Sequence, residues 1–341
     1  MKVSYRTFDL PFRHPFTISH ASKTHQPTFI VELEHFGIKG YGEAPSISYY
    51  NIPVEKMVSQ LEAKRIFIEK FSFTDPERFW HYLHHLIHGN SFLICALDIA
   101  GWDLYGKMRR KKLSELWHTG SDKPNTDFTI GIDTIEEMIK KMNEVPWPVY
   151  KIKLGTGNDI EIITELRKHT SSVFRVDANA AWEVDEALEK INIFKSLNVE
   201  LIEQPLAKDN WEGMKRLYEN SPIPLIADES CVAESDVEKC HLHFHGINIK
   251  LTKCSGITPA RRMIDKAREL GMKVMLGSMN ETTIGTAAIA HLSPFADYLD
   301  ADGPLLLAED IASGLNYDNG KISCSEGHGL GIKFSGDWSS T

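Results

Sequence analysis

The sequence lacks two features that would mark a membrane or secreted protein, namely long apolar runs and paired cysteines. No apolar segment approaches the roughly 18 residues that a membrane-spanning helix needs, and residues 1–6 contain no apolar signal core. The five cysteines are odd in number, and none forms a Cys-x-x-Cys pair, which argues against a disulfide framework or a zinc cluster. We therefore expect reduced thiols, a cytoplasmic location and no membrane partner.

Basic charge is also scarce. The formal net charge is −9 at pH 7, whereas a protein that binds a nucleic-acid backbone needs a basic face. We therefore expect no nucleic-acid partner. Hydrophobic residues make up 42% of the chain and charged residues 25%, as in an ordinary soluble globular protein. A chain of 341 residues suits a barrel with a smaller second domain.

Five short apolar runs between residues 149 and 250 indicate the fold. Each run ends in a charged side chain, and the charges recur at intervals of 22 to 26 residues, at Lys153, Asp177, Glu203, Asp228 and Lys250. That interval holds one strand, one loop and one helix, which is the rhythm of a parallel βα barrel. Because the active site of such a barrel lies at the C-terminal ends of its strands, these charges indicate chemistry there.

Three more strands would complete a barrel of eight. They are expected at residues 128–132, 273–277 and 298–300. Helices are expected between the strands, at residues 135–142, 159–169, 184–196, 211–219, 234–240, 257–270 and 285–292.

The N-terminal part has a different pattern. Residues 28–34 alternate as a strand does, Gly37 supplies a turn, and residues 38–45 return, which predicts an antiparallel pair. The polar residues 13–26 carry His14, His20 and His25. They form either a hairpin or mobile loop that could cover a site, or an ordinary loop with solvated histidines, which the sequence favours. From residue 54 to about 117 the pattern is helical. One face of this helical part is expected to hold Phe92, Cys95, Ala96, Ile99 and Trp102.

Three carboxylates end consecutive predicted strands, so Asp177, Glu203 and Asp228 can converge at one point above the barrel. Left alone they would repel one another, and a divalent cation would neutralise them. Oxygen ligands without histidine or thiolate point to Mg²⁺, with Mn²⁺ as a substitute. The alternative is three solvated carboxylates at strand ends.

Three lysines flank these carboxylates. Lys151 and Lys153 lie two apart on one strand and therefore point to the same side, and Lys250 ends a strand across the barrel. A lysine beside a cation and another lysine has its pKa lowered and becomes a usable base. Two lysines on opposite faces of one carbon can remove a proton from one side and return one to the other, which inverts a stereocentre.

Several segments together resemble the signature motifs of the enolase superfamily, in its muconate-lactonizing subgroup. The matching barrel segments are Lys151-Ile152-Lys153, Asp177-Ala178-Asn179, Glu203-Gln204-Pro205, Asp228-Glu229-Ser230 and Ile249-Lys250-Leu251. Two further segments, Gly42-Glu43-Ala44-Pro45 and residues 96–104, resemble parts of the same family's capping domain.

This resemblance implies an α/β fold, a modified TIM barrel of the (β/α)7β type with an α+β capping domain. The capping domain would span residues 1–120 and be completed by 314–341, and the barrel would span 121–313. It further implies one Mg²⁺ per subunit, held by Asp177, Glu203 and Asp228. Enolase-superfamily sites are a known case of a lysine or histidine base that works with Mg²⁺, so Lys153 and Lys250 would be the acid/base catalysts.

By the same resemblance, a substrate carboxylate binds the metal, a base removes the adjacent proton, and the metal stabilises an enediolate. Lys151 would act as an electrostatic helper near that carboxylate. Asp300-Ala301-Asp302 on the eighth strand resembles the Asp-x-Asp motif of dipeptide epimerases of the L-Ala-D/L-Glu type, where it binds the substrate's α-ammonium group. The structural alternative for this motif is an exposed turn.

The expected function is therefore that of an isomerase, a Mg²⁺-dependent dipeptide epimerase that inverts the C-terminal α-carbon of L,L-dipeptides. The rival is a muconate-type cycloisomerase or an o-succinylbenzoate synthase, whose substrates carry no amine. Strand seven ends without the histidine of acid-sugar dehydratases, at Ser278 and Met279, which we expect to line the substrate mouth. A non-catalytic binding barrel would have no use for both lysines. The number of subunits stays open, with a homo-oligomer as one possibility.

The substrate's side chain should contact the capping loops. Residues 17–22 contain no arginine to bind a glutamate side chain, which disfavours a dipeptide that contains Glu. An apolar or small side chain would suit the residues expected nearby, which are Phe16, Ile18, Tyr49, Tyr50 and Ile52.

Overall fold

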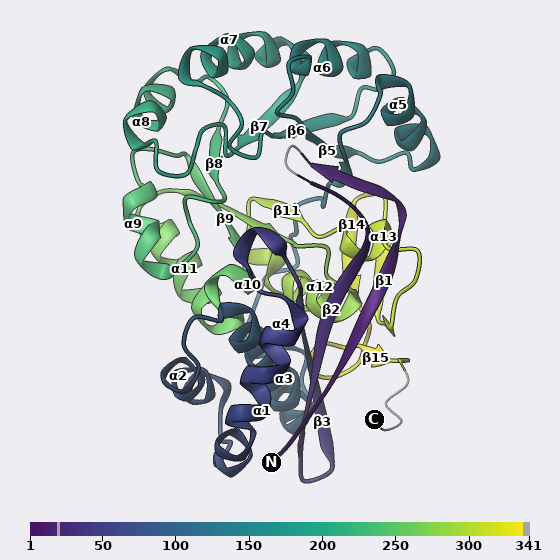
Figure 1. The fold of residues 1–341 in the computed structure, drawn as a ribbon, viewed down its shortest axis with the longest axis vertical. Coiled ribbons are helices and arrows are strands. Elements are labelled where there is room, and N and C mark those ends of the chain that lie inside the picture. Colours follow the sequence, from purple (N-terminus) through teal and green to yellow (C-terminus); the bar gives the residue numbers. More distant parts are fainter. Residues whose placement is uncertain (19–20, 337–341) are drawn as a thin grey trace.

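The computed structural model describes residues 1–18 and 21–336, while residues 19, 20 and 337–341 lie outside the described residues. An eight-stranded barrel sheet, ringed by helices, occupies one end of the molecule, and an antiparallel sheet with four helices occupies the other (Figure 1). No helix in the described residues is both long and apolar enough to span a bilayer. All five cysteines are free, and four of them are buried.

The capping sheet has the strand order β1-β2-β3. Its strands are β1 (Lys2–Ile18), β2 (Ala21–His35) and β3 (Ile38–Pro45). β1 and β2 pair from Lys2 opposite Glu34 to Ile18 opposite Ala21, with a register shift between Pro11 and Phe16. The hairpin alternative for residues 13–26 is therefore confirmed. This long hairpin reaches from the cap to the barrel strands (Figure 1).

The helices of the cap follow β3. They are η1 (Ser48–Tyr50), α1 (Val54–Lys70), α2 (Pro76–Leu86), α3 (Ser91–Arg109) and α4 (Leu113–Leu116). Helix α3 is buried on all sides rather than on the single predicted face. Phe92 and Ala96 pack in the core of the cap, whereas Cys95, Ile99 and Trp102 pack in the core of the barrel. A helix that is apolar all round is buried between two layers, so α3 joins the two parts.

The eight predicted barrel strands are all present. They are β4 (Phe128–Ile130), β5 (Val149–Lys153), β6 (Val173–Asp177), β7 (Val199–Glu203), β8 (Leu225–Ala227), β9 (Gly246–Lys250), β10 (Lys273–Gly277) and β11 (Tyr298–Asp300). They pair in parallel in sequence order. Strands of a parallel sheet are buried on both faces, which explains why each one appears in the sequence as a continuous apolar run. A bridge between Thr126 and Leu299 brings the first and last strands together.

Helices surround the barrel sheet. They are α5 (Ile135–Glu144), α6 (Asp159–Arg167), α7 (Val184–Phe194), η2 (Lys195–Leu197), α8 (Trp211–Asn220), η3 (Glu234–Asp236), α9 (Val237–Cys240), α10 (Leu251–Cys254), α11 (Ile257–Glu269), α12 (Thr283–Leu292), η4 (Ser293–Phe295) and α13 (Gly303–Leu306).

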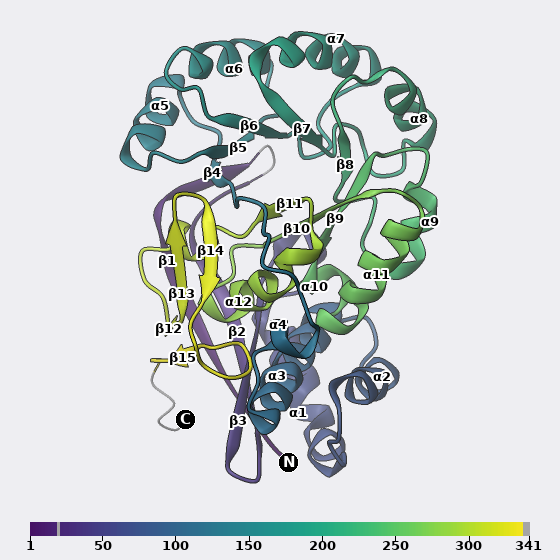
Figure 2. The same cartoon turned by 180° about the vertical axis from the view of Figure 1, so that it is seen from behind.

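The C-terminal stretch divides between the two parts. It contains β12 (Ala312–Ser313), β13 (Leu315–Asp318), β14 (Lys321–Cys324) and β15 (Lys333–Phe334). The β13–β14 hairpin lies beside α12 (Figure 2), and Ile322 belongs to the barrel core. Phe334 stacks on Tyr41 of the cap. Of the stretch 314–341 that the sequence assigns to the cap, the described residues therefore pack partly on the barrel.

Two buried carboxyl groups of the cap bind the N-termini of two barrel helices. Glu43 accepts hydrogen bonds from the backbone N–H groups of Thr282 (2.9 Å) and Gly285 (2.9 Å) at the start of α12. Asp98 of α3 accepts bonds from the N–H (2.9 Å) and hydroxyl (2.7 Å) of Thr258 on α11. A Cβ atom at position 285 would lie 3.2 Å from Glu43 Oε2, so glycine permits this close approach.

Glu43→Ala is expected to lower the free energy of unfolding by about 3 kcal/mol, because it leaves buried donors of α12 without an acceptor. Urea denaturation followed by circular dichroism would measure the loss. Glu55→Ala, which removes an exposed glutamate of α1, serves as the control and should change stability by less than about 1 kcal/mol. A Glu43→Ala protein as stable as the control would contradict this role.

Candidate active site

Strand register brings the predicted catalytic residues into line. Lys153 pairs with Asp177 on the next strand, and Asp177 pairs with Glu203 on the strand after that. On the far side, Gly277 lies opposite both Lys250 and Asp300. Side chains from strands far apart in the sequence thus lie at the same level at the C-terminal end of the barrel.

Lys153 and Lys250 flank the row of carboxylates from opposite ends. The ammonium group of Lys153 lies 2.6 Å from Asp177 Oδ2, and that of Lys250 lies 2.8 Å from Asp228 Oδ2. Burial lowers the pKa of Lys250, but the charges of Asp228 and Glu203 raise it above its ordinary value. Both lysines are therefore held in place by the acidic groups that they face.

Lys151 lies between the carboxylates. Its ammonium group is 2.7 Å from Glu203, 2.8 Å from Asp300 and 3.1 Å from Asp177. Burial alone would lower the pKa of Lys151, yet the charges of Asp300, Glu203 and Asp177 raise it well above its usual range. Lys151 therefore contacts three carboxylates, whereas Lys153 and Lys250 each form an ion pair with one.

The three predicted metal ligands are buried and held by neighbours. Burial raises the pKa of Asp177, but Lys153, Lys151 and Lys250 lower it to about 2. The pKa of Glu203 is raised by burial and by Asp177. Three carboxylates at consecutive strand ends are the hard oxygen donors that Mg²⁺ prefers, so the residues present fit the ion.

Residues outside the predicted set hold these carboxylates in position. Asn248 donates its side-chain amide to Glu203 Oε1 (2.8 Å). A Cβ atom at Gly277 would lie 2.5 Å from Asn248 Oδ1, so glycine makes room for this amide. Lys253 donates to Asp228 Oδ1 (2.6 Å). The side-chain oxygen of Gln204 accepts from the backbone N–H of Asp228 (3.0 Å) and fixes the loop after β8.

A second acidic cluster lies beside the first. Within residues 1–18 and 21–336, the one set of three ligand side chains whose oxygens lie within 4.8 Å of one another is Asp127, Asp300 and Asp302. The predicted metal triad does not form such a set, and lysine ammonium groups lie against its oxygens. Asp302 Oδ2 accepts a bond from the N–H of Thr129 (2.6 Å). The exposed-turn alternative for the Asp-x-Asp motif is wrong, since Asp300 and Asp302 are buried.

A cavity of about 760 Å³ opens over this end of the barrel. It is lined by eight of the ten predicted site residues, which are Lys151, Lys153, Asp228, Lys250, Ser278, Met279, Asp300 and Asp302. Asp177 and Glu203 are fully buried and do not line it. Loop residues beside the cavity have left-handed backbones, among them Asn179 (φ 44°) and Asn280 (φ 66°), a conformation that clusters at functional sites.

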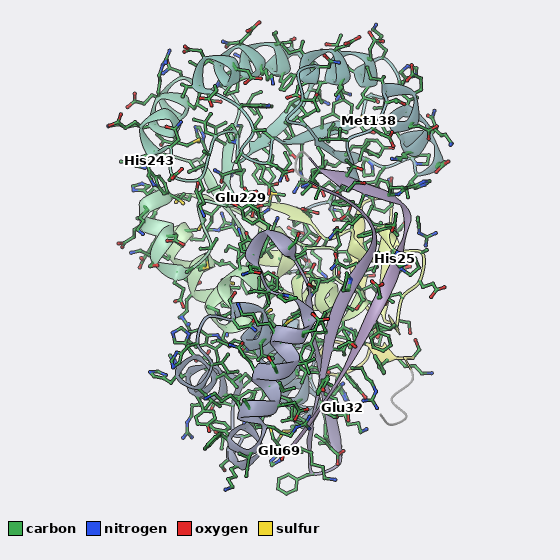
Figure 3. All side chains as sticks on the ribbon, in the orientation of Figure 1. His25, Glu32, Glu69, Met138, Glu229 and His243 are labelled. Carbon is green, nitrogen blue, oxygen red and sulfur yellow. The ribbon has the colours of Figure 1, made fainter. Side chains whose placement is uncertain are left out.

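Charged residues that the sequence interpretation did not assign also line the cavity. Glu229 lies in the middle of the molecule (Figure 3), and burial together with Asp228 raises its pKa to about 8. Lys23 of the hairpin also lines the cavity, and its ammonium group donates a hydrogen bond to Gln26 Oε1. Lys23 stands one residue after the stretch 17–22, in which no arginine was found, and it belongs to the same hairpin.

Two family descriptions match the chain. One is the mandelate racemase/muconate lactonizing enzyme N-terminal domain, over residues 2–117, and the other is an enolase C-terminal domain-like family, over residues 133–338. The chain belongs to the mandelate racemase/muconate lactonizing enzyme family. Membership of the enolase superfamily, predicted from the motifs, is thereby confirmed.

Individual members of the family are similar over nearly the whole chain. An L-Ala-D/L-amino acid epimerase of Flavobacterium johnsoniae is 51% identical over 333 residues, which cover 97% of this chain and 99% of the relative. A dipeptide epimerase of Cytophaga hutchinsonii, solved with Mg and D-Ala-L-Val, superposes with a TM-score of 0.91 at 27% identity, covering 98% and 96% of the two chains. The muconate lactonizing enzyme of Pseudomonas fluorescens, solved with muconolactone, gives 0.87 at 26% identity, over 98% and 96%.

Proposed function

We propose that the chain is a Mg²⁺-dependent dipeptide epimerase, an isomerase that inverts the C-terminal α-carbon of L,L-dipeptides by two-lysine proton transfer. The observation that carries the proposal is the pair of buried lysines, Lys153 on β5 and Lys250 on β9, which line one cavity and flank a row of carboxylates. The epimerase names of the Flavobacterium and Cytophaga relatives support the same activity.

Each lysine acts as the base in one direction of the reaction and as the acid in the other. A neutral lysine on one side of the substrate removes the α-proton, and the ammonium group of the other lysine donates a proton to the opposite face. Lys151, with its charge fixed by three carboxylates, would steady the substrate carboxylate. Asp177, Glu203 and Asp228 would hold Mg²⁺, which when bound supplies positive charge beside the α-carbon.

The Asp-x-Asp motif favours this activity over a cycloisomerase or synthase. The fold does not separate the two, because the Pseudomonas muconate lactonizing enzyme is also similar over 98% of the chain. Asp300 and Asp302 place two carboxyl groups in the cavity wall, where a substrate with a positively charged amine would compensate them. An amine-free substrate would add no positive charge to the partners they already have, which are Lys151 for Asp300 and the N–H of Thr129 for Asp302.

Proton NMR in D₂O would test the proposal. The protein is incubated with Mg²⁺ and pools of L,L-dipeptides, and loss of the C-terminal α-proton signal is followed. Exchange with appearance of the L,D-epimer is the expected result, and the responding pools identify the preferred side chain. No exchange in any pool, with the metal shown to be bound, would favour the cycloisomerase or synthase.

The cavity also indicates the substrate's side chain. All five residues predicted near it line the cavity: Phe16, Ile18, Tyr49, Tyr50 and Ile52. Lys23 adds a cation that the prediction of an apolar or small side chain did not include. Burial lowers the pKa of Lys23 to about 8, although Glu281 raises it, so Lys23 is charged near neutral pH. An apolar wall with the half-buried ammonium group of Lys23 favours a side chain that ends in a carboxylate.

Lys23→Met is expected to lower the preference for a C-terminal glutamate over glutamine about tenfold, as expected for a charge-assisted bond of about 1.4 kcal/mol. The ratio of kcat/KM for the two dipeptides measures it. In the wild type this ratio should fall as the pH rises through about 8, because Lys23 then loses its charge. Lys39→Met, at an exposed lysine of β3, is the control. An unchanged ratio in Lys23→Met would contradict the role.

A further inference from the structure

The motif that is proposed to bind the substrate's ammonium group has a third, unassigned carboxyl group. Asp127, directly before β4, is fully buried, and one of its oxygens lies within 4.8 Å of oxygens of both Asp300 and Asp302. Asp127 does not line the cavity. It therefore acts on a substrate only through the two residues that do.

Too little positive charge faces the three carboxyl groups. From β6, Arg175 donates to Asp127 Oδ2 (2.9 Å) but is shared with Glu200 (2.8 Å). From β5, Lys151 reaches Asp300 (2.8 Å) but is shared with Asp177 and Glu203. Two shared cations do not neutralise three buried carboxylates in a medium of low dielectric constant.

No further cation among the described residues forms an ion pair with the cluster, although the charges of Lys250 and Lys153 also lower the pKa of Asp300. Thr129 contributes a backbone N–H to Asp302, and the hydroxyl of Tyr317 donates to the backbone oxygen of Ala301 (2.8 Å). Asp127 Oδ1 is buried and has no hydrogen-bond partner among the described residues. An unpaired buried carboxylate oxygen is costly unless the group is protonated or a cation arrives.

The pKa values of the three carboxyl groups agree with this shortage of positive charge. Burial, and then the charge of Asp300, raise the pKa of Asp302 to about 7. Burial and Asp300 also raise the pKa of Asp127 well above its usual range, against the effect of Arg175. The pKa of Asp300 is lowered instead, because the charge of Lys151 outweighs burial. Both Asp127 and Asp302 therefore hold a proton more readily than ordinary aspartates do.

We propose that Asp127 is a positioning residue of the ammonium site, which keeps one proton on the Asp127–Asp302 pair until the substrate's α-ammonium group arrives. That group brings one positive charge, and the shared proton leaves to solvent as it binds, so the charge of the cluster stays balanced. The inference rests on the proposed function, since it requires a substrate with a free amine. It makes substrate binding a competition between a proton and an ammonium group.

This competition predicts a specific pH dependence. Below about pH 7 the pair holds its proton more firmly, so KM for a free dipeptide should rise by up to tenfold for each pH unit. The amino group of the free dipeptide is protonated in this range, because α-amino groups have pKa values of about 8. An N-acetylated dipeptide has no ammonium group, and its binding should release no proton.

The first test uses the wild-type protein with Mg²⁺. Binding of a free L,L-dipeptide at pH 6.5, in two buffers of different ionisation enthalpy, gives the proton release by calorimetry. About one proton per site is the expected result for the free dipeptide and none for the N-acetylated one. Absence of release with the free dipeptide would overturn the inference, whether or not any variant folds.

The second test compares two variants that each remove one carboxylate partner of Arg175. Asp127→Asn removes one of the two carboxyl groups proposed to hold the proton, so the rise in KM should move to lower pH. Glu200→Gln removes the partner outside the cluster, and its pH profile should match the wild type. If the pH profile of Asp127→Asn were the same as that of Glu200→Gln and of the wild type, the role of Asp127 would be overturned. If the D₂O assay shows exchange in such a case, the proposed function still stands; without exchange, the function itself fails.

Discussion

Alanine in place of Lys153 or of Lys250 is expected to reduce epimerisation by about 10³-fold, within the range usual for loss of a general acid or base. Inversion needs a proton removed from one face of the α-carbon and another delivered to the opposite face. The two lysines lie on β5 and β9, with β6, β7 and β8 between them. Neither lysine can replace the other, because each is tied to its own carboxylate, Asp177 or Asp228.

Exchange experiments distinguish this role from simple structural damage. Each alanine variant keeps one lysine, so it should still exchange the α-proton of one epimer with D₂O while failing to produce the other. The two variants should prefer opposite epimers. A variant with an alanine at the exposed Lys273 of β10 is the control and should behave as the wild type. If either site variant kept most of its epimerase activity, the two-lysine reaction would be wrong.

The barrel was predictable because its signal is repeated along the chain. Each strand is a short apolar run that ends in a charge, and the same interval separates one from the next. The register of the parallel strands then places Lys153, Asp177 and Glu203 side by side. Neighbouring parallel strands of similar length end at the same level of the barrel. The main site residues lie at strand ends, where sequence position alone predicts convergence.

The residues that the sequence did not reveal reach the site by other routes. Asp127 lies before its strand and meets Asp302 only because β4 and β11 are brought together by barrel closure. Lys23 reaches the cavity because a long hairpin crosses from the cap to the barrel. Both contacts depend on pairing between distant segments, which no local pattern encodes.

Helix α3 shows a similar limit. Its apolar residues were expected on one face, because a period of three to four residues predicts a single buried stripe. In the structure Phe92 and Ile99 pack into two different cores. A helix between two layers is apolar all round, and the sequence contains no sign of how many layers there are.

The second large effect concerns which acidic cluster binds the metal. Glu203→Gln should weaken Mg²⁺ binding by at least about 100-fold, since the loss of a residue that only hydrogen-bonds to a metal ligand already lowers metal affinity about 10- to 100-fold. Asp302→Asn should leave Mg²⁺ affinity nearly unchanged and raise KM for the dipeptide instead. Chelation of the metal should abolish epimerisation in the wild type, and added Mg²⁺ should restore it. Calorimetric titration with Mg²⁺ alone measures the affinities without any substrate.

The comparison is decisive because the two clusters differ in their cations. Four lysine ammonium groups, those of Lys151, Lys153, Lys250 and Lys253, lie against Asp177, Glu203 and Asp228, whereas Asp127, Asp300 and Asp302 bring their oxygens closer together. Proximity alone would therefore assign the metal to the second cluster. If Mg²⁺ binding were lost in Asp302→Asn and kept in Glu203→Gln, the second cluster would be the metal site. It would then have no role in binding an ammonium group, and the case for a dipeptide over an amine-free acid would rest on the relatives alone.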